Sequence, residues 1–254
     1  MIQLKGIFRY VTFGLRQEWI SLFFNNGLEI LKNSGLGPKQ KQALYHFLKD
    51  AELIRDKTNT TQFFDKMKTL YSKGASSDSF WSFLWINISY NSPLFKWYNM
   101  LEPGEYTKKD IFNRLSDDYG KKSIAVGGVC TSLISTFAAT PIGTDLKIGK
   151  VIKQGNARKI IKQGGYRFHP LVILYSLYKY AEHSKSREIP IHEIKDSPLS
   201  PQKIFVLDTE QIRQSILSLF EPDFITVDFD KEEILFSLNK DKTVSDVMDL
   251  YLMK

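Results

Sequence analysis

The chain has 254 residues, of which 43% are hydrophobic and 13% aromatic, a composition that excludes a disordered protein and allows a full core. Cys130 is the only cysteine, which excludes a disulfide framework and a four-cysteine zinc site and favours a cytoplasmic location. The net charge of +7 is unevenly distributed, because residues 147–187 carry ten Lys and Arg and one acid, whereas residues 188–254 carry fourteen acids and seven bases. The typical partner of such a basic segment is a phosphate backbone.

Neither a secretion signal nor a membrane span is expected. Lys5, Arg9 and Arg16 interrupt the apolar residues at the start of the sequence. Residues 123–144 lack charge over 22 positions, long enough to cross a bilayer. Their apolar side chains, however, recur every three or four positions and form one helical stripe, opposite a face of Gly, Ser and Thr. This pattern favours a buried helix over a membrane span.

The first 75 residues predict two helices followed by a short hairpin. Residues 13–31 show helical periodicity, residues 35–38 break it, and Pro38 suits the first turn of a second helix that ends near Asp50. Residues 53–54 then form a short strand before a polar turn. This is the order of a winged-helix module, and we assign residues 1–75 to it.

The start of the second helix is a candidate DNA contact. Lys39, Gln40 and Lys41 would face the major groove in a winged helix, where Lys and Gln bond phosphates or base edges. Arg16, at the start of the first helix, joins this group as a phosphate contact. The alternative is that these side chains are ordinary solvent-exposed polar residues at the starts of two helices.

Residues 76–187 form the expected central helical domain. Residues 80–88 are an aromatic core helix, residues 91–104 a loop, and residues 107–110 a capping-box start of a short helix. The basic band, defined as residues 147–187, includes short strands at residues 151–152 and 159–161.

The basic band supplies most of the candidate DNA contacts. Glycines in its loops allow the backbone to approach a phosphate, and the flanking cations release counterions. The alternative is a solvent loop with ordinary surface lysines. An ATP site at residues 143–150 is excluded, because five residues instead of four separate the glycines and Val151 replaces the required Ser or Thr. The candidate phosphate contacts are Lys147, Lys150, Lys153, Arg158, Lys159, Lys162 and Arg167.

Residues 188–254 form the third expected domain, acidic and built as helix, hairpin and helix. Asp208 caps the first helix, and the strand-like residues 225–227 and 234–236 are joined through Asp230. Asp223, Asp228 and Asp230 are explained by turn chemistry better than by a metal, so we assign no metal ligands. The expected fold class is α+β, mainly α-helical, with winged-helix-like units and short β-hairpins.

Several short motifs, spread over nearly the whole chain, resemble a bacterial family of domains of unknown function associated with DNA phosphorothioation operons. They are residues 10–16 with Trp19, residues 36–40, residues 43–44, residues 50–54, residues 97–98 before 106–107, residues 197–201 and residues 204–207. The resemblance departs at one place: many relatives carry a His-Glu pair where this chain has Tyr10 and Val11.

The resemblance implies a component of the machinery that places sulfur in one DNA strand, and the specific candidate is the DNA nickase that acts before sulfur insertion. It implies double-stranded DNA as a ligand, a cysteine desulfurase, an ATPase and a sulfonucleotide-reductase-like protein as partners, a role in antiphage defence, and a divalent metal as cofactor if the chain nicks DNA. A homodimer is also possible. The catalytic residues are unknown. The alternative is a DNA-binding or scaffold subunit without enzymatic activity, whose acidic tail docks a sister protein.

Overall fold

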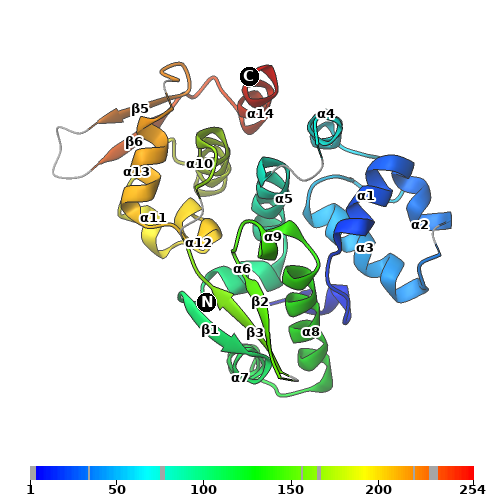
Figure 1. The fold of residues 1–254 in the computed structure, drawn as a ribbon. Coiled ribbons are helices and arrows are strands. Elements are labelled where there is room, and N and C mark those ends of the chain that lie inside the picture. The colour runs from blue at the N-terminus through cyan, green and yellow to red at the C-terminus, as the bar shows by residue number, and fades with distance from the viewer. Residues whose placement is uncertain are drawn as a thin grey trace. The chain divides into compact units, whose positions relative to one another are not determined.

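The computed structural model describes residues 4–33, 35–74, 78–155, 157–164, 167–219, 221–228 and 234–254. They form two compact units, Met1–Gln163 (unit 1) and Gly164–Lys254 (unit 2), a boundary that falls inside the range 76–187. Both units are mainly helical, and each contains a three-stranded antiparallel sheet (Figure 1). The expected α+β, mainly α-helical class is therefore confirmed. None of the described helices combines the length and the hydropathy that crossing a bilayer requires.

Unit 1 consists of nine α-helices, two 3-10 helices and one small sheet in its described part. Its α-helices are α1 (Gln17–Asn26), α2 (Ile30–Asn33), α3 (Pro38–Asp50), α4 (Gln62–Ser72), α5 (Asp78–Asn91), α6 (Pro93–Asn99), α7 (Lys108–Tyr119), α8 (Ile124–Ala138) and α9 (Pro141–Thr144). Its 3-10 helices are η1 (Ile7–Tyr10) and η2 (Gly27–Glu29), and its strands are β1 (Gly104–Thr107), β2 (Lys150–Gln154) and β3 (Ala157–Lys162). The sheet lies beside α7 and α8 (Figure 1).

The aromatic helix α5 is the centre of unit 1. Ten consecutive residues of it, from 80 to 89, are buried, so this helix is enclosed on all sides. Trp85 packs edge-on against Phe95 of α6 and lies 5.8 Å from Phe137 of α8, measured between ring centroids. The expected aromatic core helix is thus confirmed. The expected loop at 91–104 is wrong in part, because Ser92 caps α6 and Pro93 begins it.

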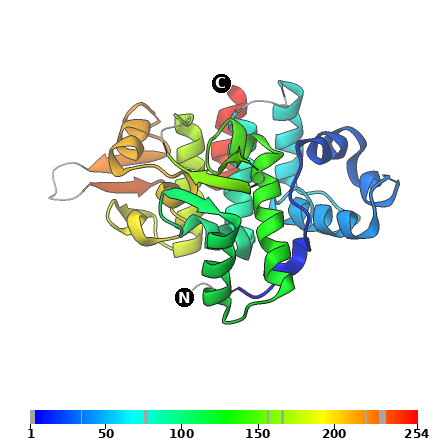
Figure 2. The same ribbon diagram turned by 60° about the horizontal axis from the view of Figure 1, so that its bottom comes forward.

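Helix α8 confirms the expected buried helix, and its small residues receive the N-terminal segment. A Cβ on Gly14 would lie 2.3 Å from the Thr136 backbone nitrogen and 2.6 Å from the Ser132 carbonyl oxygen. The Ser132 hydroxyl donates to the Phe13 carbonyl (2.7 Å), and the Leu15 N–H donates to the Thr136 hydroxyl (3.0 Å). The segment passes beside α8 in both views (Figures 1 and 2). The hydroxyl face of α8 therefore fixes the position of residues 13–15, which follow η1.

The sheet of unit 1 has the order β1-β3-β2, and its register separates the basic band onto two faces. Ile160 lies opposite both Tyr106 and Val151, and this inner face holds the buried Ile160 and Tyr106. Because side chains alternate along a strand, Arg158, Lys162 and Lys153 belong to the inner face. The outer face contains Lys150, Ile152, Lys159 and Ile161.

Unit 2 contains α10 (Pro170–Ser184), β4 (Glu188–Pro190), α11 (Glu193–Asp196), α12 (Pro201–Phe205), α13 (Thr209–Leu217), β5 (Ile225–Asp228), β6 (Leu235–Leu238) and α14 (Val244–Met253). Its sheet has the order β4-β6-β5. Asp208 caps α13 in a capping box, as expected, and the predicted hairpin is confirmed by β5 and β6. The expected turn at Asp230 lies outside the described residues.

The N-terminal helices partly follow the expectation. Helix α3 begins at Pro38 and ends at Asp50, as predicted. The helix expected over 13–31 is interrupted, because Gly27 adopts a positive φ of 61°, ends α1 and begins η2, which precedes α2. The short strand is reduced to one bridge between Ile54 and Thr60.

Candidate nucleic-acid interface and carboxylate cluster

The exposed cations of the basic band in unit 1 lie at three different places. Lys153 and Arg158 pair across the β2–β3 hairpin next to its turn, and both are exposed. Lys150 is exposed on the outer face, where Lys159 is half-buried with its Nζ 3.5 Å from Glu105 Oε2. Lys147 is exposed before β2, with a left-handed φ of 58°. The hairpin end therefore presents two adjacent cations, whereas the Lys159 charge is partly neutralised.

The sequence predicts that Lys162 contacts phosphate, and its surroundings do not fit that expectation. It is only 2% exposed, and its Nζ donates to the carbonyls of Tyr98 (3.0 Å), Asn99 (2.8 Å) and Leu101 (2.5 Å). These carbonyls belong to the end of α6 and the residues after it, where a helix has fewer backbone donors for its last C=O groups. The Tyr98 carbonyl also accepts from the Leu101 N–H (3.1 Å). The Lys162 ammonium satisfies them and is enclosed by protein, so its place is structural.

The N-terminal candidates are separate from the hairpin in sequence, and part of the group has intramolecular partners. Gln40 accepts from the Gly37 N–H (3.0 Å) and so completes the cap of α3, while Lys41 Nζ donates to the Lys32 carbonyl (2.5 Å). Lys39 and Arg16 are exposed, and the Arg16 guanidinium lies 5.6 Å from the Trp19 ring centroid. Gln40 and Lys41 therefore help to build the start of α3.

Arg167 belongs to unit 2, where it is exposed and lines a hollow of about 350 Å³ beside α13. The hollow also contains Phe168, Leu207 and Gln214. The structure therefore places the predicted phosphate contacts in both units.

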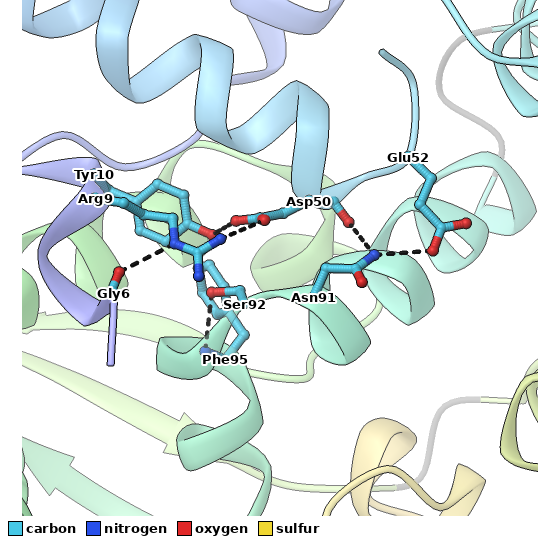
Figure 3. Close-up of polar contacts among 8 residues, drawn as sticks. All are labelled: Gly6, Arg9, Tyr10, Asp50, Glu52, Asn91, Ser92 and Phe95. Atoms are coloured by element: carbon cyan, nitrogen blue, oxygen red, sulfur yellow. Dashed lines mark hydrogen bonds and ion pairs between the residues drawn. The ribbon is translucent and has the colours of Figure 1, made fainter. Parts of the chain in front are cut away.

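A second group of polar residues joins η1, α3 and α5 inside unit 1 (Figure 3). Arg9 Nη1 donates to Asp50 Oδ1 (2.7 Å), and the Tyr10 hydroxyl donates to Asp50 Oδ2. Asn91 Nδ2 donates to the Asp50 carbonyl (3.0 Å) and to Glu52 Oε1 (2.9 Å). We call these five residues the carboxylate cluster. Sequence reasoning missed it, because residues 9–10, 50–52 and 91 are far apart in the chain.

Burial dominates the ionisation of this cluster. It raises the pKa of Asp50 to about 6, although Arg9 and Tyr10 act in the opposite direction. Burial also raises the pKa of Tyr10 well above its usual value, and the neighbouring Asp50 charge adds to this. Tyr10 therefore stays protonated and donates, while Asp50 changes charge near neutral pH.

Two residues in or next to the carboxylate cluster have strained backbones. Val11 has φ 58° and ψ −104°, which is unusual for a β-branched side chain, and Glu52 has φ 59°. Such conformations cost about 1–3 kcal/mol each and concentrate at functional sites. A hollow of about 480 Å³ opens beside Asp50, Glu52 and Asn91. A buried carboxylate, a hollow and local strain make the cluster a candidate functional site.

We expect Asp50→Asn to change how stability depends on pH. A raised folded-state pKa means that the contribution of Asp50 is complete below its unfolded pKa of 3.8 and is lost as the pH rises through about 6. The free energy of unfolding of the unmodified protein, relative to Asp50→Asn, should fall by about 2.4 kcal/mol between about pH 4 and pH 7.

Urea unfolding at a series of pH values measures this difference. Asp65→Asn is the matched control, because Asp65 is exposed on α4, and it should show no such trend. A difference between the unmodified protein and Asp50→Asn that is constant with pH would contradict the effect of burial.

Among known proteins, similarity to this chain is found in solved structures and not in sequence families. No protein-family model and no curated protein matches the sequence. The fold resembles that of SspB. A magnesium ion-bound SspB crystal structure aligns with a TM-score of 0.69 and 14% sequence identity. A second SspB crystal structure aligns with a TM-score of 0.69 and 12% sequence identity. Each alignment covers 96% of this chain and 87% of the SspB chain. At these identities the similarity establishes the shared fold.

Proposed function

We propose that this protein is a DNA-binding component of a bacterial DNA phosphorothioate modification and defence system. The observation that carries the proposal is the similarity in fold to SspB, which extends over 96% of the chain. The sequence motifs that resemble the phosphorothioation-associated family point in the same direction. Double-stranded DNA is the proposed ligand.

The charge distribution supports unit 1 as the DNA-binding part. Residues 1–163 contain 24 Lys and Arg against 13 Asp and Glu, whereas residues 164–254 contain 11 against 15. A net charge of +11 on unit 1 attracts a phosphate backbone, and released counterions stabilise the complex. Lys153 and Arg158 at the end of the hairpin are the exposed pair that we place on phosphates, with Lys150 and Lys147 as further contacts.

Unit 2 has the element order of a winged helix. Helices α12 and α13 are joined by a three-residue turn, with Val206 in a left-handed conformation, and β4, β5 and β6 form the accompanying sheet. Helix α13, in the position of a recognition helix, carries one Glu and one Arg, and these two pair (3.1 Å). With its net charge of −4, unit 2 is suited to a basic protein surface better than to DNA. We therefore propose it as the docking module for partner proteins of the system.

DNA nicking is the second candidate, favoured by the buried Asp50 carboxylate between strained Val11 and Glu52. The magnesium in an SspB crystal structure suggests a metal for such chemistry. The donor set of the carboxylate cluster does not fit a magnesium centre, because Arg9 and Tyr10 occupy both Asp50 oxygens. Nor does the described part of the chain bring three His, Cys, Asp or Glu side chains together for a metal. We therefore derive no metal-dependent step.

Incubation with supercoiled plasmid, with and without Mg²⁺ or Mn²⁺, tests both candidates. A retarded plasmid band without open-circle product supports DNA binding without cutting. Open-circle product that disappears with EDTA supports a nickase, and Asp50→Asn then tests whether the carboxylate cluster is its centre. A plasmid that is neither retarded nor nicked would contradict the proposed DNA-binding role.

A further inference from the structure

A hollow of about 390 Å³ lies between the first turn of α7, the middle of α8 and the start of β3. Its volume is within the range of small-ligand sites. The hollow is formed by a rim of cations and a floor of two hydroxyls and one apolar side chain. These residues are Lys108, Lys109 and Arg158 at the rim, and Thr131, Ser135 and Ile134 below.

The rim is positively charged, and none of the described residues that line the hollow is an acid. Lys108, Lys109 and Arg158 are all exposed, so their charges remain available to a ligand. Asp110 is the acid of the same helical turn, and its carboxylate accepts from the Thr107 N–H (2.8 Å) and hydroxyl (2.7 Å) in the capping box. Three cations from two segments some fifty residues apart thus face one hollow. Their positive charges repel one another, and a bound anion would offset this repulsion.

Thr131, in the floor of the hollow, holds the Lys108 side chain of the rim in place. Lys108 Nζ donates to Thr131 Oγ1 (2.9 Å), and the Thr131 hydroxyl donates to the Gly127 carbonyl (3.0 Å). Thr131 and Ser135 are one helical turn apart and half-buried, so they present hydroxyls at the same side of α8. Ile134 is 4% exposed and gives an apolar wall. Hydroxyls and cations bind phosphate oxygens, and an apolar wall suits a sugar or base.

We propose that this hollow is a phosphate pocket, which holds one phosphate group of a nucleic-acid strand. Lys109 and Arg158 pair with the phosphate oxygens, Ser135 donates its hydroxyl to them, and Lys108 adds charge from its position on Thr131. The inference of a nucleic-acid ligand rests on the proposed function, whereas phosphate binding by the pocket stands on its own geometry. The phosphate can belong to a strand end or to the interior of a strand.

The test is the affinity for a 3′-labelled single-stranded thymidine oligonucleotide, measured with and without a 5′-phosphate. We expect Lys109→Gln with Arg158→Gln to lower the affinity at least about 10-fold. The control is Lys121→Gln with Lys122→Gln, an equal change of charge at two exposed lysines outside the pocket, which should lower it less than about 3-fold. A loss confined to the 5′-phosphorylated strand identifies a terminal phosphate, and an equal loss for both strands identifies an internal one.

Ser135→Ala removes a hydroxyl without changing the charge, and we expect it to lower the affinity about 3-fold. Equal losses in the pocket and control pairs, with no effect of Ser135→Ala, would overturn the pocket. If the unmodified chain does not bind this single strand, the proposed binding of double-stranded DNA is judged by the plasmid experiment and not by this one. Titration with thymidine 5′-monophosphate, with thymidine as the reference that lacks a phosphate, then tests the pocket separately. Weaker binding of the monophosphate by the Lys109→Gln/Arg158→Gln variant than by the unmodified chain supports the pocket. Equal binding by the two proteins, or no binding by either, overturns it.

Discussion

Gly14→Ala is expected to lower the free energy of unfolding by about 3 kcal/mol, because overpacking against backbone atoms cannot be relieved by a side-chain rotation. The new Cβ would lie 2.3 Å from the Thr136 nitrogen, so α8 and the N-terminal segment must separate. Separation weakens the hydrogen bonds from Ser132 to Phe13 and from Leu15 to Thr136. Urea unfolding at neutral pH measures the loss.

The matched control is Gly35→Ala. A Cβ on Gly35 would meet no atom within 4 Å, and the residue lies in an exposed bend, so its substitution should change stability by less than about 0.5 kcal/mol. Equal stability of Gly14→Ala and Gly35→Ala would show that the segment does not pack on α8 as described. The same segment carries Arg9 and Tyr10, so Gly14→Ala should also disturb the carboxylate cluster.

Lys162→Met is expected to destabilise unit 1 by about 3 kcal/mol, because it removes three charge-assisted hydrogen bonds to buried carbonyl oxygens. The Lys162 ammonium is the donor to Tyr98, Asn99 and Leu101, and it also lies 5.0 Å from the Tyr98 ring centroid. Methionine preserves the length of the side chain and its apolar contacts, so the loss reports the ammonium group. Thermal and urea unfolding both measure it.

Lys150→Met is the control for this substitution. Lys150 lies on the neighbouring strand β2 but is exposed, so the same change of residue type should cost less than about 0.5 kcal/mol. Comparable losses for the two variants would contradict the structural role of Lys162. A stable Lys162→Met protein with weakened DNA binding would restore Lys162 as a phosphate contact.

Local sequence signals predicted the elements that local chemistry determines. Pro38 marks the start of α3, Asp208 caps α13, and the apolar stripe of residues 126–137 identifies α8 as a buried helix. Cys130 lies on that stripe and is buried, as expected, which raises the pKa of its thiol to about 11. These features depend on residues within one or two turns of each other, and the sequence displays them directly.

Features that depend on distant residues could not be predicted in this way. The sequence shows Lys162 as one cation of a basic band, and only strand register reveals that it alternates to the buried face. Asp50 meets Arg9 across 41 positions, and no periodicity connects them. The phosphate pocket likewise combines the capping box of α7 with Arg158, about fifty residues later. Counting charges along the sequence located the basic region, but it did not show which of its side chains lie on the inner and which on the outer face of the sheet.

The salt dependence of duplex DNA binding tests most directly the claim that unit 1 holds DNA through its exposed hairpin cations. For the unmodified chain, the logarithm of the affinity should fall linearly with the logarithm of salt concentration between about 50 and 300 mM. Lys153→Ala with Arg158→Ala should make the slope shallower by about 1.8, as expected for two lost phosphate contacts. A slope that is the same in the variant, or an affinity that does not depend on salt, would contradict the account.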